Sequence, residues 1–404
     1  MSRRRIVVTG IGAVTPLGAG AETLFDRWSD GASGIADGLG RCADFDPTEH
    51  LKRKEIKRYD RFTQFAVVAA EEALASAGWD DGLPVAADRI GCVIGTGNGG
   101  SGTLEEGLDA LIQGPEYVSS LLIPKSMANA ASGVLALRFG LEGPAFAVVS
   151  ACSSGADAIT DGIRMLRLGE TDAMVVGGAE AEIVRMPLAA FANMEALSEK
   201  GISRPFDARR DGFVMGEGAG ILVLEAAEVA EERGARIYGE ILGYGITNDA
   251  HHIVAPHPEG RGAILAIQRA LEDAGLDPSD VDYVNAHGTG TPANDRSETR
   301  ALKVVLGDRA KDVPVSSLKS AIGHLIGAAG AVESVATLLA LERRVAPPTL
   351  NYEVPEDGLD LDYVPKKSRP LFQNGAENGH RPVAISNAFG FGGHNSVLVL
   401  AAAE

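Results

Sequence analysis

Segments with the apolar pattern of strands alternate with segments of helical periodicity along the whole chain. Strands are predicted over residues 6–9, 89–95, 145–150, 172–178, 218–225, 236–245, 281–286, 313–317, 383–386 and 395–401. Helices are predicted over residues 62–77, 153–168, 262–274, 297–306 and 328–341. This alternation predicts an α/β fold in which sheets are covered by helices.

One unit, a strand followed by a turn of small residues and then a helix, occurs around Cys152 and again around His324. The recurrence predicts an internal duplication, with residues 1–245 and 246–404 as its two halves. No low-complexity linker separates the halves, so we expect them to share one interface. Residues 375–381, which are rich in Gly and Asn, are predicted to form an exposed loop.

Composition narrows the class of protein. Of the 404 residues, 45% are hydrophobic and 23% are charged, which is typical of a soluble globular protein. The apolar run near the N-terminus ends at Gly10, too early for an export signal, and no apolar stretch is long enough to span a membrane. The three cysteines predict a reducing compartment without disulfides, and no C-x-x-C pair suggests a metal. We therefore expect a cytoplasmic protein that does not bind membranes.

The net charge of −18 disfavours binding to nucleic acids, because phosphates repel an acidic surface. Residues 52–61 form the exception, with six Lys and Arg side chains among ten residues. Two readings of this run stay open: a solvated helix face, or a docking patch for an acidic partner.

Cys152 lies where a strand ends, a turn of small residues follows and a helix begins. A helix N-terminus favours a thiolate, the reactive form of cysteine, so a reactive thiol is predicted. The alternative is a buried structural cysteine, which is the commoner case. Small neighbours argue against it because they leave room for a substrate, whereas Cys92 is predicted to be a core residue of its strand.

His287 and His324 each follow a predicted strand and stand close to small residues. They could activate the thiol, or they could donate hydrogen bonds to a carbonyl that gains negative charge. Lys319 and Glu333 flank the second histidine. Small and apolar surroundings favour a buried ion pair over two surface charges.

Two glycine-rich segments need an explanation. Residues 95–100 fit the pattern G-x-G-x-x-G after a strand, but no acidic residue follows about 20 positions later at a strand end. A dinucleotide site is therefore not expected. Residues 389–395 form either a tight packing turn or a backbone N–H donor with a movable aromatic ring beside it.

Taken together, these segments resemble the β-ketoacyl-acyl carrier protein synthases of the elongating type II class, the condensing enzymes of fatty acid synthesis. Order and spacing fit over nearly the whole chain. The matching motifs lie at residues 7–10, 149–155, 204–220, 285–292, 319–324 and 389–393. The resemblance implies a thiolase-like fold of five αβαβα layers built from two duplicated halves, and a homodimer.

The resemblance also implies roles for individual residues. Cys152 would accept an acyl chain as a thioester, and His287 and His324 would bind the malonyl thioester and promote its decarboxylation. Backbone N–H groups of Cys152 and Phe391 would hold the oxyanion. The pair formed by Lys319 and Glu333 would organise the histidines.

Substrate contacts follow in the same way. The residues implied to bind the phosphopantetheine arm or to shape and gate the pocket are Thr289, Thr291, Phe213, Phe389 and Phe391. Asn98 occupies a position where the family usually has an apolar residue beside the acyl pocket, so the preferred acyl length stays open. No cofactor is required. Some family members hold a monovalent cation near the positions that match Asn285, Glu333, Ser386 and Asn387.

The implied partner is an acyl carrier protein, which is acidic in this family. The matching docking residues are Lys54, Lys57 and Arg58. A polyketide ketosynthase subunit remains an alternative, since its chemistry is the same and only its substrates differ. A chain-length factor is disfavoured because it lacks the thiol, and a thiolase is disfavoured because no second cysteine follows Cys152.

Overall fold

The computed structural model describes residues 3–372 and 380–404, and within them it contains one large mixed sheet. The strands follow one another in the order β4-β3-β5-β6-β1-β7-β13-β12-β8-β9, with the short β2 (Gly18–Ala19) beside β1. In the first half the strands are β1 (Ile6–Thr15), β3 (Ile90–Gly95), β4 (Ala145–Val148), β5 (Ala173–Glu180) and β6 (Gly218–Ala226). In the second half they are β7 (Gly239–Asn248), β8 (Tyr283–Asn285), β9 (Val315–Ser316), β12 (Val383–Gly390) and β13 (His394–Ala402).

The two halves repeat one pattern of strand pairing. From β1 outward, the first half pairs β6 and β5 antiparallel and then β3 and β4 parallel. From β7 outward, the second half pairs β13 and β12 antiparallel and then β8 and β9 parallel. The halves meet where β1 and β7 pair antiparallel at Val7 and Val8. The predicted duplication is therefore confirmed at the level of topology. Its second repeat begins with β7 at Gly239, whereas the sequence placed the division inside that strand, at residue 245.

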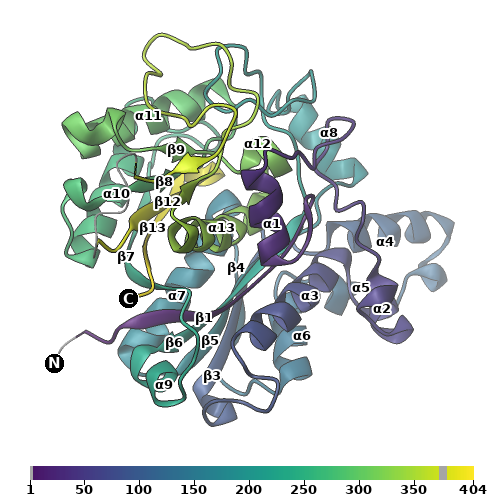
Figure 1. Ribbon diagram of the computed structural model, residues 1–404. Helices are drawn as coiled ribbons and strands as arrows, with labels where there is room; N and C mark the ends of the chain where they lie inside the picture. The colour runs from purple at the N-terminus through teal and green to yellow at the C-terminus, as the bar shows by residue number, and fades with distance from the viewer. Residues whose placement is uncertain (1–2, 373–379) are drawn as a thin grey trace.

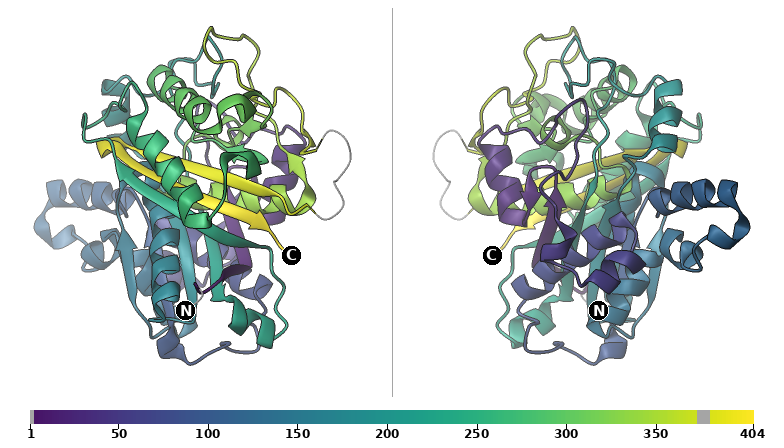
Figure 2. Two further views of the ribbon diagram at one scale, coloured as in Figure 1. Left: turned by 90° about the vertical axis from the view of Figure 1, so that its left-hand side faces the viewer. Right: turned by 90° about the vertical axis from the view of Figure 1, so that its right-hand side faces the viewer.

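Helices lie on both faces of each half of the sheet, which gives five layers (Figures 1 and 2). The central layer is formed by α7 (Ser154–Leu168) and α13 (Ala329–Arg343), which contact each other and both halves of the sheet. The outer layers are α3 (Arg61–Ser76) with α6 (Ala130–Phe139), and α10 (Arg261–Ala274) with α11 (Pro292–Leu306). The remaining elements are α1 (Ala21–Ser29), α2 (Arg53–Arg58), α4 (Ser101–Gln113), α5 (Leu122–Ser126), α8 (Arg185–Asn193), α9 (Ala227–Glu232), α12 (Lys319–Ile322), β10 (Val345–Ala346) and β11 (Arg369–Pro370).

Glycines in the first strand of each repeat let a helix lie directly on the sheet. A Cβ at Gly12 would stand 2.0 Å from the carbonyl oxygen of Ala69 in α3. In the second repeat, a Cβ at Gly245 would stand 2.0 Å from the carbonyl oxygen of Ala266 in α10. No side chain fits in either place, so the same close contact explains both glycines.

The predicted strands and helices all occur, with shifted ends. The largest shift is in β1, which ends at Thr15 instead of residue 9. Helix α11 begins at Pro292 instead of residue 297, because proline suits the first position of a helix. Helices α1, α4, α5, α6 and α8 occupy segments for which no element was predicted. The predicted loop at 375–381 falls mostly on residues 373–379, outside the described residues. Within residues 3–372 and 380–404, no helix has the length and apolarity needed to cross a membrane.

Candidate active site

Cys152 stands on a turn between β4 and α7, as the sequence predicts. Ala151 before it has a φ of 52°, in the left-handed region, and a short 3₁₀ turn over Ala151–Ser153 leads into α7. Asp157, in the first turn of α7, accepts hydrogen bonds from the hydroxyls of Ser150 and Ser153 on either side of Cys152. These hydrogen bonds to α7 thus stabilise the turn, in which Ala151 has a left-handed backbone conformation.

The ionisation of the thiol depends on two opposing effects. Burial raises the pKa of Cys152 to about 11, although the nearby Lys319 and a hydrogen bond from the backbone N–H of Phe391 both lower it. The thiol of the free protein is therefore mostly protonated at neutral pH, although its place at a helix N-terminus favours the thiolate. A helix N-terminus lowers the pKa of a thiol, but burial of the sulfur away from water raises it by more.

Glycine at position 390 lets a second chain segment approach the nucleophile. A Cβ at Gly390 would stand 3.1 Å from the backbone nitrogen of Cys152 and 2.9 Å from the carbonyl oxygen of Ser150. The segment 389–395 is the turn between β12 and β13, and it carries Phe391 beside the sulfur. Its reading as a backbone donor with an adjacent ring matches this geometry.

The two histidines arrive from different elements. His287 follows β8, and its backbone N–H donates to Glu298 over 2.8 Å. His324 follows the single turn α12, not a strand directly, and its Nδ1 accepts a hydrogen bond from the backbone N–H of Ile326 at 3.3 Å. Because Nδ1 is an acceptor, the proton of neutral His324 lies on Nε2, which has no hydrogen-bond partner among the described residues and can donate.

Both imidazoles are uncharged near neutral pH. Burial lowers the pKa of His287 and of His324 well below the usual value, and the positive charge of Lys319 lowers both further. Their rings lie 5.4 Å apart between centroids and almost perpendicular. Two neutral histidines are suited to donate hydrogen bonds, so the structure favours that reading over activation of the thiol by a charged ring.

Lys319 and Glu333 form the predicted buried ion pair. Both side chains are almost fully buried. Burial raises the pKa of Glu333 to about 7, and Lys319 acts in the opposite direction. Because one partner left alone would be an unpaired buried charge, the pair is costly to break.

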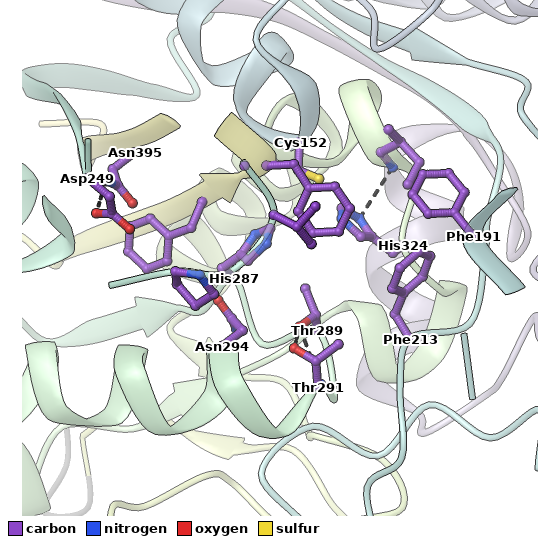
Figure 3. Close-up of a pocket in the computed structure, with 16 residues that line it drawn as sticks. Cys152, Phe191, Phe213, Asp249, His287, Thr289, Thr291, Asn294, His324 and Asn395 are labelled. Atoms are coloured by element: carbon purple, nitrogen blue, oxygen red, sulfur yellow. Dashed lines mark hydrogen bonds between the residues drawn. The ribbon is translucent and has the colours of Figure 1, made fainter. Parts of the chain in front are cut away.

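The pocket around these groups is mostly apolar (Figure 3). The sulfur of Cys152 and the rings of His287 and His324 face the same space. Thr289 and Thr291 lie on another side of it, with their hydroxyl oxygens 2.9 Å apart. The other predicted lining residues are present as well, namely Phe213, Phe389 and Phe391.

Three buried side-chain oxygens near Lys319 have no hydrogen-bond donor within residues 3–372 and 380–404: Asn285 Oδ1, Asn387 Oδ1 and Glu333 Oε2. Asn285 contacts the backbone of Glu333, and it pairs in register with Ser386 in β12. Oxygen ligands of this kind suit a hard cation such as Na⁺ or K⁺. The residues predicted for a monovalent cation therefore fit one.

Asn98 and the basic run lie elsewhere. Asn98 does not line the pocket; it is exposed, and its amide donates to Glu182 at 3.2 Å. Its predicted contact with substrate is not seen in this single chain. Lys54, Lys57 and Arg58 are exposed on the short helix α2.

Several site residues escaped the sequence analysis. Phe191 and Ile326 line the pocket, and the carboxylates of Asp295 and Glu298 accept backbone N–H groups of the loop 287–290. Two acidic residues three apart on one helix face were the available signal. That signal was hidden because the predicted helix began after Asp295.

A duplicated αβαβα fold with a cysteine on a strand-to-helix turn and two neutral histidines facing it defines a thiolase-like enzyme class. The family described as "Beta-ketoacyl synthase, N-terminal domain" matches residues 3–230, and "Beta-ketoacyl synthase, C-terminal domain" matches residues 238–353. The chain belongs to the β-ketoacyl synthase family.

Relatives in other organisms are similar over their whole length. The chain is 47% identical to 3-oxoacyl-[acyl-carrier-protein] synthase 2 of Synechocystis, over 98% of both chains. It is 42% identical to the Staphylococcus aureus protein of the same name, again over 98% of each. Among solved structures, the ishigamide ketosynthase/chain length factor superposes with a TM-score of 0.91 at 35% identity, covering 100% of both chains. A β-ketoacyl synthase from Burkholderia phymatum gives a TM-score of 0.89 at 31% identity, covering 99% and 100%.

Proposed function

We infer that the protein catalyses the condensing step of fatty acid elongation, as a 3-oxoacyl-[acyl-carrier-protein] synthase of the type II class. The observation that carries this conclusion is the convergence of Cys152 with two neutral histidines, one of which has a free Nε2–H, in a single pocket. The whole-length similarity to two synthases of this name supports it.

In the first half-reaction, the sulfur of Cys152 attacks the carbonyl carbon of an acyl thioester. A new C–S bond forms, the bond to the carrier's thiol breaks, and the proton of Cys152 passes to the departing thiolate. The oxyanion of the intermediate is held by the backbone N–H groups of Cys152 and Phe391, which Gly390 allows to come close. Since the thiol is protonated at rest, this transfer must remove its proton as the bond forms.

In the second half-reaction, the bond between the malonyl carboxylate and its neighbouring carbon breaks and releases CO₂. His287 and His324 donate hydrogen bonds to the thioester oxygen, which gains negative charge as the enolate forms. The electron pair of that carbon then attacks the carbonyl of the acyl-Cys152 thioester. The C–S bond breaks, the thiolate is reprotonated, and 3-oxoacyl-carrier protein leaves.

Neutral histidines suit this step. A donor that holds its proton stabilises the enolate by a hydrogen bond without protonating it. Burial keeps both rings neutral, and the positive charge of Lys319, itself paired with Glu333, acts in the same direction. The hydroxyls of Thr289 and Thr291 would hydrogen-bond the phosphopantetheine arm. A monovalent cation would be held by the unpaired oxygens of Asn285, Asn387 and Glu333.

We propose that the partner is an acidic acyl carrier protein, which docks on α2 through Lys54, Lys57 and Arg58. We also propose that the protein acts in the cytoplasm. The related complex of a type II polyketide carrier protein with its ketosynthase, at 32% identity and a TM-score of 0.90, supports a carrier-bound substrate.

We propose a homodimer as well. Strand β4 is a free edge of the large sheet, and exposed apolar side chains lie around it on α4, α5, α6 and α8. Among them, Ile112 is 83% exposed and Leu137 is 87% exposed. An open strand edge with a surrounding apolar surface is typical of an interface.

The test is a condensation assay with malonyl-carrier protein and acyl-carrier proteins from C4 to C18. Wild type should form product with a maximum at one chain length, and Cys152→Ala should form none. Cys92→Ala is the matched control, because Cys92 is equally buried but lies in β3, outside the pocket. Failure of the folded wild type with every primer would overturn the proposal and favour a polyketide subunit that lacks its partner.

A further inference from the structure

The glycine-rich turn at residues 95–100 holds a carboxyl group, and that group is a side chain of the protein itself, Glu180. The backbone N–H of Gly97 donates to Glu180 Oε2 at 2.5 Å, and the hydroxyl of Thr96 donates to Glu180 Oε1 at 2.9 Å. Glu180 ends β5 and is fully buried. Backbone N–H and hydroxyl donors of a glycine-rich turn are the kind of groups that hold phosphates in other proteins, and here they hold the carboxyl group of Glu180.

The same carboxylate reaches the segment that carries His324. Glu180 Oε2 also accepts the backbone N–H of Gly327 at 2.9 Å. The residue before it, Ile326, lines the pocket, has a φ of 46°, and donates its N–H to His324 Nδ1. The backbone of His324 is hydrogen-bonded to Val214 and Gly216 of the first half, and this oxygen atom adds a further link to the turn after it.

Glycines make this junction possible. A Cβ at Gly327 would stand 2.3 Å from the nitrogen of Gly97, and a Cβ at Gly97 would stand 2.8 Å from Glu180 Oε2. The two backbones touch, so the position of Gly327 depends on the turn at Gly97 and on the carboxylate between them. Burial raises the pKa of Glu180 to about 8, with the neighbouring Glu182 acting in the same direction and the three donors opposing it.

We propose that Glu180 is a positioning residue, which sets the orientation of His324 by holding Gly327 and the glycine-rich turn together. This inference rests on the proposed role of His324 in the malonyl half-reaction. Without the carboxylate, the N–H groups of Gly97 and Gly327 would be buried and unpaired, and the turn after His324 would move. A displacement of about 1 Å at a catalytic group costs on the order of 100-fold in rate.

Three substitutions of Glu180 distinguish the position of its acceptor oxygens from the presence of a carboxyl group. Glu180→Gln keeps the length of the side chain. Its amide oxygen can accept both N–H groups, and its NH₂ can donate to Thr96. Glu180→Asp keeps the carboxyl group but withdraws its oxygens by one methylene. Glu180→Ala removes every acceptor. Glu72→Ala is the matched control, because Glu72 also accepts two backbone N–H groups, from Ala13 and Ala21, on α3.

Each variant is assayed for acylation of Cys152 by acyl-carrier protein and for condensation. We expect Glu180→Ala to lose about 100-fold in condensation and to acylate within about threefold of wild type. Glu180→Gln should condense within about threefold of wild type and faster than Glu180→Asp. The comparison between these two conservative variants tests the proposal even if the alanine variant does not fold.

Condensation by Glu180→Asp as fast as by Glu180→Gln would overturn the proposal, as would equal losses in both half-reactions. Unimpaired condensation by a folded Glu180→Ala would do the same. Acylation and condensation by Glu72→Ala should stay at wild-type rates in the folded fraction. A wild type that acylates but does not condense would count against the proposed function itself, so the two failures are distinguishable.

Discussion

At the scale of single residues, the site combines a protonated nucleophile with uncharged histidines, and burial is the common cause. Burial raises the pKa of Cys152 to about 11 and lowers the pKa of His287 and His324. Lys319 is the cation that acts on all three. One buried ammonium thus eases ionisation of the thiol while it keeps both imidazoles neutral.

This arrangement predicts how the free thiol reacts. The rate of alkylation of Cys152 by iodoacetamide should rise about tenfold per pH unit from pH 7.5 to 9.5 without a plateau, because the thiolate fraction is still growing. In Lys319→Met the pKa should rise further, so that alkylation at pH 9 slows by about tenfold. Lys303→Met, a change at a surface ion pair, is the control. A plateau near pH 7 in wild type would contradict a raised thiol pKa.

At the scale of elements, close backbone contacts decide where the functional groups stand. Gly12 and Gly245 bring α3 and α10 onto the sheet, and Gly390 brings the β12–β13 turn to Cys152. The short helix α2 is a different kind of element, because its exposed face carries Lys54, Lys57 and Arg58 and contributes no lining to the pocket. Its charges are available for a partner.

Charge reversal on α2 tests that partner. The double variant Lys57→Glu and Arg58→Glu should raise the apparent KM for acyl-carrier protein by about tenfold and leave kcat unchanged, since electrostatic steering acts on the encounter. The effect should shrink at high salt. The double variant Lys366→Glu and Lys367→Glu, an exposed adjacent pair before β11, is the matched control. An unchanged KM in the α2 variant would remove α2 as the docking site.

At the scale of the whole molecule, the duplication creates one pocket from two halves. Cys152 comes from the first repeat, whereas His287, His324 and Phe391 come from the second. The central layer of α7 and α13 joins the repeats and begins at the two catalytic turns. Strand β4 is the last strand at one end of the sheet, and in the proposed dimer it would pair with a second copy of the chain.

Light scattering tests the proposed dimer. The double variant Leu137→Asp and Val149→Asp places charges on exposed apolar positions beside the β4 edge, and it should convert the dimer to a monomer. Val304→Asp, at a position of similar exposure on α11, should remain dimeric. A wild type that is monomeric at micromolar concentration, or a double variant of unchanged mass, would contradict this interface.

The residue pattern alone was enough to predict the α/β alternation, the duplication, the strand-to-helix turn at Cys152 and the buried Lys319–Glu333 pair. Each of these is a local signal: a period of apolar residues, or a reactive side chain beside small residues at the end of a strand. The catalytic roles of Cys152, His287 and His324 were implied by the family resemblance and stay predictions. Residue type was also enough to argue against a nucleotide in the glycine-rich turn, because no acidic residue follows at the required spacing.

Packing decided the rest. Glu180 and Gly327 are 147 residues apart in the sequence, so no local pattern connects the glycine-rich turn to His324. Asn98, predicted beside the substrate, is instead exposed on this chain, and its amide donates to the buried Glu182. The helix N-terminus at Cys152 favours a thiolate, whereas burial, which only the folded chain reveals, raises the pKa of this thiol. Desolvation and long-range hydrogen bonds depend on which distant segments meet, and that is a property of the folded chain.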